Sequence, residues 1–238
     1  MIIRLISYIY EIRNRMQMYI WNMADRFSKY HGNVIMFHNI TDESIETLES
    51  CKCKVAVFEQ ILLDKLNKSQ IISIDDMLRI IECKRFENFT VITFDDIPET
   101  VYTNAFPLLK KYNIPFTIFV STEFVNRKGF VTLEQLKQMA ECPLCTIGAH
   151  SDKHIMLRKC ENIKDQLVKN KLFLETHIDK AVEYLAYPYG RYESVSKRAQ
   201  KIAKEVGFKC AFSTIQSTIN QMSSRNLYFL PRLIENKL

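Results

Sequence analysis

Short runs of apolar, β-branched and aromatic residues alternate along this chain with longer segments in which apolar residues recur every three or four positions. The short runs predict β-strands and the longer segments predict amphipathic α-helices, since each spacing places apolar side chains on one face of its element. The predicted strands are residues 34–37, 89–94, 115–120, 146–148, 183–187, 209–213 and 228–233. The predicted helices are residues 57–66, 75–81, 99–112, 133–140, 162–177 and 193–206.

This alternation of strands and helices indicates one fold class. Strands that are joined by helices within one domain run parallel, and about seven of them are enough for a closed or nearly closed barrel. We therefore expect an α/β protein with a distorted or incomplete (β/α) barrel of about seven parallel strands. No Gly/Ser linker, low-complexity tract or internal repeat interrupts the pattern, so residues 31–238 are predicted to form a single domain.

Residues 1–30 differ from the rest of the chain. Charged residues interrupt their apolar pattern, which predicts one amphipathic helix and excludes a membrane span. The uninterrupted apolar stretch and the cleavage site of a signal peptide are missing. We predict an N-terminal helical extension, and the pattern favours a helix packed on the domain or on a partner over a helix on a membrane surface.

Composition narrows the function classes. The chain has 33 Lys and Arg against 27 Asp and Glu, and the net charge of +6, without a basic tract or motif, does not indicate nucleic-acid binding. Its seven cysteines, an odd number without an evident export signal, are expected to be reduced thiols in a cytoplasmic protein, with peripheral membrane attachment as the alternative. Cys142 and Cys145 have the spacing of a redox or zinc site, but no second pair follows, so packing is favoured.

Polar residues follow four of the predicted strands at their carboxyl ends. Because sites in such barrels form where the carboxyl ends of the strands meet, we expect these side chains to lie close together. Core packing does not explain four polar clusters at the same end. The clusters are His38, the pair Asp95 and Asp96, His150, and the pair Pro188 and Tyr189.

Two of these clusters together suggest a metal site. His150 and His154 stand at positions i and i+4, which would place both imidazoles on one side of a helical turn and within reach of one ion. Each cluster also has an ordinary explanation, because an Asp pair before a Pro often caps a helix and a single His pair is often exposed. Ser73 and Asp76 form such a predicted capping pair. The joint occurrence of the two clusters favours the metal site.

Four segments, in their order and spacing, resemble the polysaccharide deacetylase family, the NodB-homology group of carbohydrate esterase family four. The resemblance covers the chain from about residue 34 to residue 232. It implies a metal-dependent hydrolase that removes N-acetyl groups from an acetamido sugar or polysaccharide precursor. The implied cofactor is a divalent ion, zinc first and nickel, cobalt or iron as alternatives. The segments are residues 93–96, 105–120, 148–154 and 186–190.

The resemblance also implies roles for individual residues. By matched motif, Asp95 resembles the general base, and the metal ligands are Asp96, His150 and His154. Arg232 resembles a late Arg that orients the base. One oxygen and two nitrogens would leave open positions on the ion for water and an acyl oxygen.

The turn after the fifth predicted strand has a role of its own. We expect the residues of this turn, Pro188, Tyr189 and Gly190, to bind the oxyanion through backbone N–H groups, although Pro188 has none.

Departures from the family pattern leave a second function open. Ile97 stands where the family commonly has Gly, Ala186 stands where it often has Arg, and no late Leu-x-His motif is present. The alternative is a catalytically degenerate fold that binds carbohydrate or protein. With the late His missing, His38 is the remaining histidine at a strand's carboxyl end and is our candidate for the acid that protonates the leaving amine. His31 and His177 are expected to be solvated.

Overall fold

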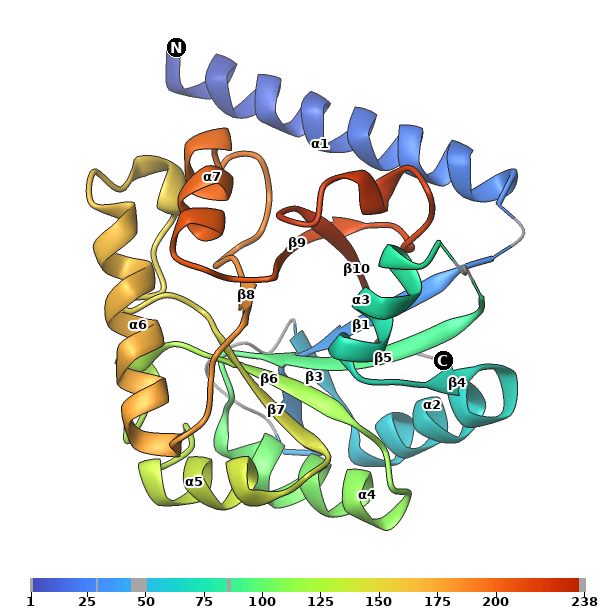
Figure 1. The fold of residues 1–238 in the computed structure, drawn as a ribbon, viewed down its shortest axis with the longest axis vertical. Coiled ribbons are helices and arrows are strands. Elements are labelled where there is room, and N and C mark those ends of the chain that lie inside the picture. Colours follow the sequence, from blue (N-terminus) through green and yellow to red (C-terminus); the bar gives the residue numbers. More distant parts are fainter. Residues whose placement is uncertain (1, 29, 44–50, 85–86, 236–238) are drawn as a thin grey trace.

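The computed structural model describes residues 2–28, 30–43, 51–84 and 87–235, and within them seven parallel strands close into a barrel (Figure 1). The barrel closes because β1 pairs with both β5 and β10. This confirms the predicted fold class. The strands are β1 (Gly32–Phe37), β5 (Phe89–Asp95), β6 (Phe116–Val120), β7 (Cys145–Ala149), β8 (Tyr184–Ala186), β9 (Cys210–Gln216) and β10 (Leu230–Ile234).

Helices surround this barrel, and every predicted helix has a counterpart. The one predicted over residues 99–112 is interrupted, because the π-helical turn η2 (Val101–Ala105) precedes its α-helical part. Three very short strands were not predicted: β2 (Asn39–Ile40), β3 (Lys52–Cys53) and β4 (Gln70–Ile71), which adds to β5 outside the barrel. The helices after the first are α2 (Val55–Lys68), α3 (Ile74–Glu82), α4 (Phe106–Lys111), α5 (Leu133–Glu141), α6 (Ile163–Ile178) and α7 (Lys197–Glu205).

Alternation along the strands decides which side chains reach the candidate site. All seven residues of β5 are buried, as is typical of a parallel strand covered on both faces. Phe94 belongs to the larger apolar cluster, and Val91 to the smaller cluster that also contains Phe119 and Phe212. Because successive side chains point to opposite faces, Asp95 lies on the same face as Val91.

The N-terminal residues form the helix α1 (Ile2–Arg26), which lies across one side of the barrel above α7 and β9 (Figure 1). The connection from β9 to β10 contains only the short 3-10 helix η5 (Ser223–Arg225). Within the described residues, no helix has the length and apolarity needed to span a membrane. The division of the chain into an extension of residues 1–30 and a domain of residues 31–238 remains a prediction.

Candidate active site

The two adjacent carboxylates at the end of β5 have different partners. Asp95 ends the strand, and the backbone then turns sharply, with φ values of 62° at Asp96 and 47° at Ile97. The N–H of Ile97 donates to the Asp95 carbonyl at 2.7 Å. A positive φ is unusual for a residue with a β-branched side chain, so this turn is strained. It directs the neighbouring carboxylates to separate groups.

Asp96 lies between the two histidines that follow β7. Its Oδ1 atom is 3.1 Å from Nε2 of His154 and 3.4 Å from Nε2 of His150. The three ligand atoms lie within 4.8 Å of one another, and Asp96 and His150 are almost completely buried. Two ligands of a tetrahedral zinc ion are separated by roughly 3.3 Å, so the arrangement has a suitable size for such an ion.

The hydrogen bond of His150 shows which of its nitrogens is available. Its Nδ1 lies 2.7 Å from the carbonyl oxygen of Ala186, which can only accept, so Nδ1 carries a proton. In the neutral ring, Nε2 then has a free lone pair directed towards Asp96. Asp96 Oδ1 is buried and receives no properly directed hydrogen bond within the described residues. An orphaned carboxylate oxygen facing an imidazole lone pair fits a bound cation.

The charge state of Asp96 agrees with this reading. Burial raises the pKa of its carboxyl group, but the positive charge that His150 and His154 carry when protonated lowers the pKa more strongly, to well below its usual value. A cation bound to the neutral rings would supply the same positive charge. The side chain is therefore an anion, the form that binds a metal ion.

The histidine pair is not on a helical turn, so that prediction is wrong. Residues 150–156 form an irregular loop, with φ values of 64° at Ser151 and 44° at His154. Two residues in the left-handed region cannot continue a right-handed helical turn. The loop nevertheless brings the rings together, with 5.0 Å between the centroids of His150 and His154.

Asn170 on α6 supports this loop, and the sequence analysis missed it. Its Oδ1 accepts the backbone N–H of His150 at 2.9 Å, and its Nδ2 donates to the Val120 carbonyl and to Thr122 Oγ1. The residue is fully buried. A signal was present in the sequence, because Asn170 replaces an apolar residue in the stripe that includes Leu167 and Leu174.

Asp95 belongs to a buried ion pair instead of the metal cluster. Both of its oxygens accept from Arg232, at 2.7 and 2.6 Å, and Arg232 Nε donates to the Ser213 carbonyl. Burial raises the pKa of Asp95, but the positive charge of Arg232, and after it that of His150, lowers the pKa by more than burial raises it. The carboxylate therefore stays ionised. Arg232 thus lies where the family resemblance implied.

His38 reaches the same end of the barrel. It is close enough to Asp95, Asp96 and His150 for their charges to affect its pKa, which burial lowers below its usual value. The ring makes no hydrogen bond to the residues that the structure describes. A hydrogen bond to the backbone therefore does not explain why a histidine stands at this strand end. His31 and His177 lie elsewhere and are hydrogen-bonded, to Asp25 and to the Phe173 carbonyl.

The turn after β8 has one backbone N–H group available. The N–H of Gly190 donates to the Pro188 carbonyl at 2.8 Å, whereas the N–H of Tyr189 has no acceptor among the described residues. Gly is required at position 190, because φ is 62° and a Cβ atom would lie 2.5 Å from the Thr214 nitrogen. The Tyr189 ring lies 5.0 Å from the His154 ring.

Two further expectations can be compared with the structure. The capping pair is confirmed, since Ser73 Oγ accepts from the N–H of Asp76 at 3.1 Å, whereas Asp96 precedes an irregular turn and caps no helix. Cys142 is half-buried and Cys145 is buried in β7, and both are free thiols. This agrees with packing roles for the two cysteines.

Comparison with known proteins finds deacetylases that this chain resembles. The chain is 28% identical over 228 residues to the poly-beta-1,6-N-acetyl-D-glucosamine N-deacetylase of Staphylococcus aureus, covering 88% of this chain and 75% of that protein. Similar solved structures include the Streptococcus pyogenes deacetylase PplD in complex with acetate, with a TM-score of 0.76, 21% identity and coverage of 88% and 94%. IcaB from Ammonifex degensii has a TM-score of 0.71, 22% identity and coverage of 87% and 93%.

The family model that describes polysaccharide deacetylases matches residues 84–211, more than half of the chain. This segment contains Asp95, Asp96, His150, His154 and the turn after β8. The chain therefore belongs to the polysaccharide deacetylase family.

Proposed function

We propose that this protein is a metal-dependent hydrolase that cleaves the amide bond of N-acetyl groups on a glycan. The observation that carries the proposal is the division of the carboxylates. Asp96 faces two imidazole nitrogens with an oxygen that has no hydrogen bond in the described part of the chain, and Asp95 is paired with Arg232 instead. One anion is thus assigned to a cation, and the other remains available as a base.

The proposed cation site consists of Asp96, His150 and His154. A divalent ion bound there would supply Lewis acidity, which polarises an acyl oxygen and makes water more acidic. A carboxylate and two imidazoles suit zinc, which we propose as the metal, and they also accept nickel, cobalt or iron(II). The N–H of Tyr189 would donate to the acyl oxygen as negative charge develops on it.

Asp95 would take the proton of the attacking water. Its two hydrogen bonds to Arg232 leave further lone pairs on each oxygen, and they fix the orientation of the carboxylate. The low pKa keeps it ionised and ready to accept at neutral pH. Arg232 is a positioning residue, since it acts through Asp95.

The leaving amine needs a proton, and we assign its transfer to His38. Because burial lowers its pKa, His38 is neutral before the reaction. It would first receive the proton that Asp95 took from the attacking water, which returns Asp95 to its ionised form. The imidazole would then act as the general acid for the departing nitrogen.

We propose a polymer that contains N-acetylglucosamine as the substrate, in line with the names of the curated relatives. Two aromatic rings near His154 support a sugar substrate. Phe124 lies 5.2 Å and Tyr189 5.0 Å from the His154 ring, and Tyr189 is half exposed. Such faces pack against the apolar side of a sugar ring.

The test combines metal analysis of the purified protein with acetate release from N-acetylglucosamine oligomers. We expect about one divalent ion per chain, acetate release that a chelator abolishes, and its recovery when zinc is added. Asp96→Asn should lose the ion, and Asp76→Asn, at the capping pair, should keep it. A chain that binds the ion and the oligomers without releasing acetate would favour the alternative, a carbohydrate-binding module.

A further inference from the structure

The helix α1 is attached to the barrel through both polar and apolar contacts. Asn14 Nδ2 donates to Glu193 at 2.7 Å, and Asn14 Oδ1 accepts the N–H of Tyr192 at 3.0 Å. The Tyr192 hydroxyl donates to Gln17 at 2.8 Å. Trp21, 5% exposed, adds an apolar contact on the same face. The face of α1 that points to the barrel is thus defined by these residues.

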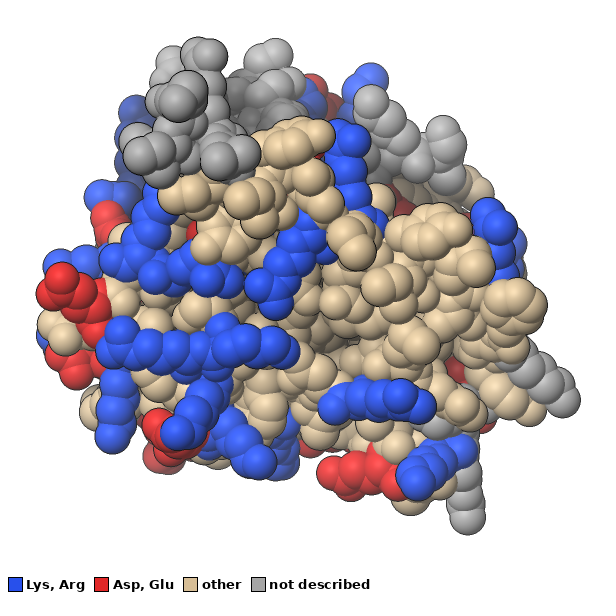
Figure 2. Space-filling model, turned by 90° about the horizontal axis from the view of Figure 1, so that it is seen from above, with Lys and Arg blue, Asp and Glu red and all other residues tan. Residues whose placement is uncertain are grey.

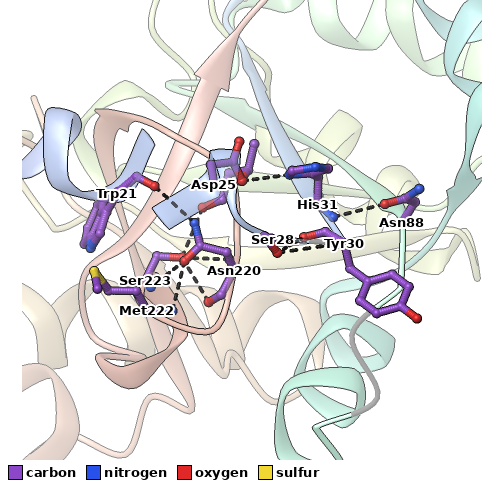
Figure 3. A network of polar contacts seen from close by, with 10 residues as sticks. Trp21, Asp25, Ser28, Tyr30, His31, Asn88, Asn220, Met222 and Ser223 are labelled. Atoms are coloured by element: carbon purple, nitrogen blue, oxygen red, sulfur yellow. Dashed lines mark hydrogen bonds and ion pairs between the residues drawn. The ribbon is translucent and has the colours of Figure 1, made fainter. Parts of the chain in front are cut away.

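A network at the carboxyl end of α1 fixes its rotation (Figure 3). Asn220 Nδ2 donates to the Trp21 carbonyl at 3.4 Å, and Asp25 accepts from His31 Nδ1 at 2.7 Å and from the Thr218 hydroxyl. His31 precedes β1, and Thr218 and Asn220 follow β9. Hydrogen bonds to two separate parts of the chain therefore fix the rotation of the helix about its own axis.

The opposite face of α1 is apolar and exposed to solvent. We call it the outer face, and its residues recur at helical spacing on one side and continue into the turn after the helix. Tyr19 is 66% exposed, and Phe27, in that turn, is 85% exposed. An ordinary surface helix has the reverse arrangement, with apolar residues inside and polar residues outside. The outer face comprises Ile9, Ile12, Met16, Tyr19, Ile20 and Met23 of α1 and Phe27 of the turn.

Positive charge lies beside this apolar strip. The helix α7, below the amino-terminal half of α1 in Figure 1, exposes four basic side chains. Arg158 links α1 to the loop that precedes α7, because its guanidinium lies 4.7 Å from the Tyr10 ring and donates to the Val195 carbonyl. Figure 2 looks onto this side and shows an uncharged band with Lys and Arg gathered next to it. The basic residues of α7 are Lys197, Arg198, Lys201 and Lys204.

We propose that the outer face of α1 binds the surface of a membrane that contains anionic lipids, with the helix lying in the plane of the interface. A long apolar strip beside basic residues is the combination that interfacial helices use. The exposed strip would enter the boundary of the acyl chains, and the α7 cations would lie against lipid phosphates. Tyr19 combines an apolar ring with a polar end, which suits this boundary.

Charge argues for lipid as the occupant, against a second copy of the chain. A symmetric dimer through the outer face would bring together two copies of the same basic chain, each with a net charge of +6. Lys201 has a salt bridge to Glu205 at 3.6 Å, but no salt bridge joins Lys197, Arg198 or Lys204 to an acidic residue within the described part of the chain. Like charges at an interface oppose association, whereas anionic lipid complements them.

Membrane binding would also determine how close the candidate site lies to the bilayer. Asn14 is bonded to Tyr192 and Glu193, in the loop that follows the turn containing Tyr189. The middle of α1 therefore lies beside the loop that follows the carboxyl end of β8, the end of the barrel where the site residues gather. The site would face substrate close to the bilayer.

Vesicle sedimentation of the full chain tests the proposal. We expect the protein to sediment with vesicles of phosphatidylcholine and phosphatidylglycerol and to stay in solution with phosphatidylcholine alone. Tyr19→Glu with Phe27→Glu should reduce the bound fraction roughly tenfold or more, because both charges would enter the interface. Leu172→Glu is the matched control, since Leu172 is a large apolar residue on α6 that is 56% exposed.

A second set of variants tests the charge contribution. Lys197→Gln, Lys201→Gln and Lys204→Gln together should weaken binding to the anionic vesicles and leave the thermal unfolding temperature unchanged. Circular dichroism and acetate release in solution establish that each variant is folded. Wild-type protein that remains in solution with anionic vesicles, or variants that bind as it does, would overturn the proposal. So would a dimer in solution that Tyr19→Glu with Phe27→Glu dissociates.

Discussion

Two regions reverse the usual distribution of buried apolar and exposed charged residues, and they do so in opposite directions. One is the end of the barrel that carries the site, and the other is the outer face of α1. The site buries charged groups, with Asp95, Asp96 and Arg232 at most 3% exposed. The outer face exposes large apolar groups, with Phe27 at 85%. Each reversal is unfavourable by itself, because buried charge loses hydration and exposed apolar surface orders water.

The difference lies in what each region lacks. In the site, both oxygens of Asp95 accept from Arg232, whereas an anionic oxygen of Asp96 faces two imidazoles and has no hydrogen bond among the described residues. The missing group is therefore a cation. On α1 the polar groups of the inner face are bonded to the barrel, and the apolar strip lacks cover. The missing partner there is an apolar surface, and the adjacent lysines favour a surface that also carries negative charge.

The largest effects are expected from the metal ligands. Asp96→Asn, His150→Ala and His154→Ala should each lose the ion and nearly all acetate release, because three ligands leave no redundancy. Asp95→Asn should keep the ion and lose turnover. Metal content and single-turnover rates measure both effects. Equal loss of metal in Asp95→Asn and Asp96→Asn would remove the contrast between the two carboxylates.

The next largest effect concerns the buried ion pair. Arg232→Met leaves the Asp95 carboxylate buried without a partner, which should lower the free energy of unfolding by roughly 3–5 kcal/mol. Arg79→Met is the control: its salt bridge to Asp76 is exposed, and little change is expected. Urea denaturation at neutral pH distinguishes the two. A stable Arg232→Met protein would show that Asp95 does not need its partner.

The ion pair of Asp95 and Arg232 also predicts that the free energy of unfolding depends on pH. The pKa of Asp95 is lower in the folded chain than its unfolded value, about 3.9. Its contribution to stability is therefore complete above that value and decreases as the pH falls towards the folded pKa. Arg232→Met and wild type should become more alike in acid than at pH 7. A difference in unfolding free energy that grows on acidification would contradict this sign.

A smaller effect is expected at His38. If it delivers the proton to the leaving amine, His38→Ala should reduce turnover by roughly 10²- to 10⁴-fold with normal metal content. His31→Ala and His177→Ala are controls, because both rings are bonded far from the site residues. Near-normal turnover in metal-loaded His38→Ala would leave water or the substrate as the proton source.

The sequence predicted the barrel well, for a physical reason. Strands such as β5 are buried on both faces, so their apolar runs are continuous, and polar residues such as Asp95 mark their ends. The sequence did not predict the loop of His150 and His154, because spacing alone cannot distinguish a helical turn from residues with positive φ. It also missed Asn170, whose role depends on a contact between α6 and the end of β7.

The orientation of α1 could not be predicted either. An amphipathic helix usually packs through its apolar face, whereas α1 meets the barrel through the face that carries Asn14 and Gln17. That choice depends on Asn14, Gln17 and Asp25, whose partners lie more than 170 residues away or across a turn. Polar contacts of this kind have no periodic signature.

The smallest expected effect tests how the core supports the site. Ile97 has a φ of 47°, which the Gly common in the family would adopt without strain, and its side chain is fully buried in the larger apolar cluster. Ile97→Ala loses that packing and keeps the strain, whereas Ile97→Gly loses the packing and relieves it. Both variants should be destabilised, by roughly 2–5 kcal/mol for Ala, but Gly should be the more stable by about 1 kcal/mol.

Urea denaturation measures the stability of the two Ile97 variants, and their metal content is the second measurement. The buried side chain of Ile97 holds the turn that presents Asp96, so apolar packing compensates for the strain in the polar site. Both variants should retain the ion once folded, since no ligand is removed. If Ala proves more stable than Gly, the turn is not strained, and the replacement of Gly by Ile needs no compensation from the core.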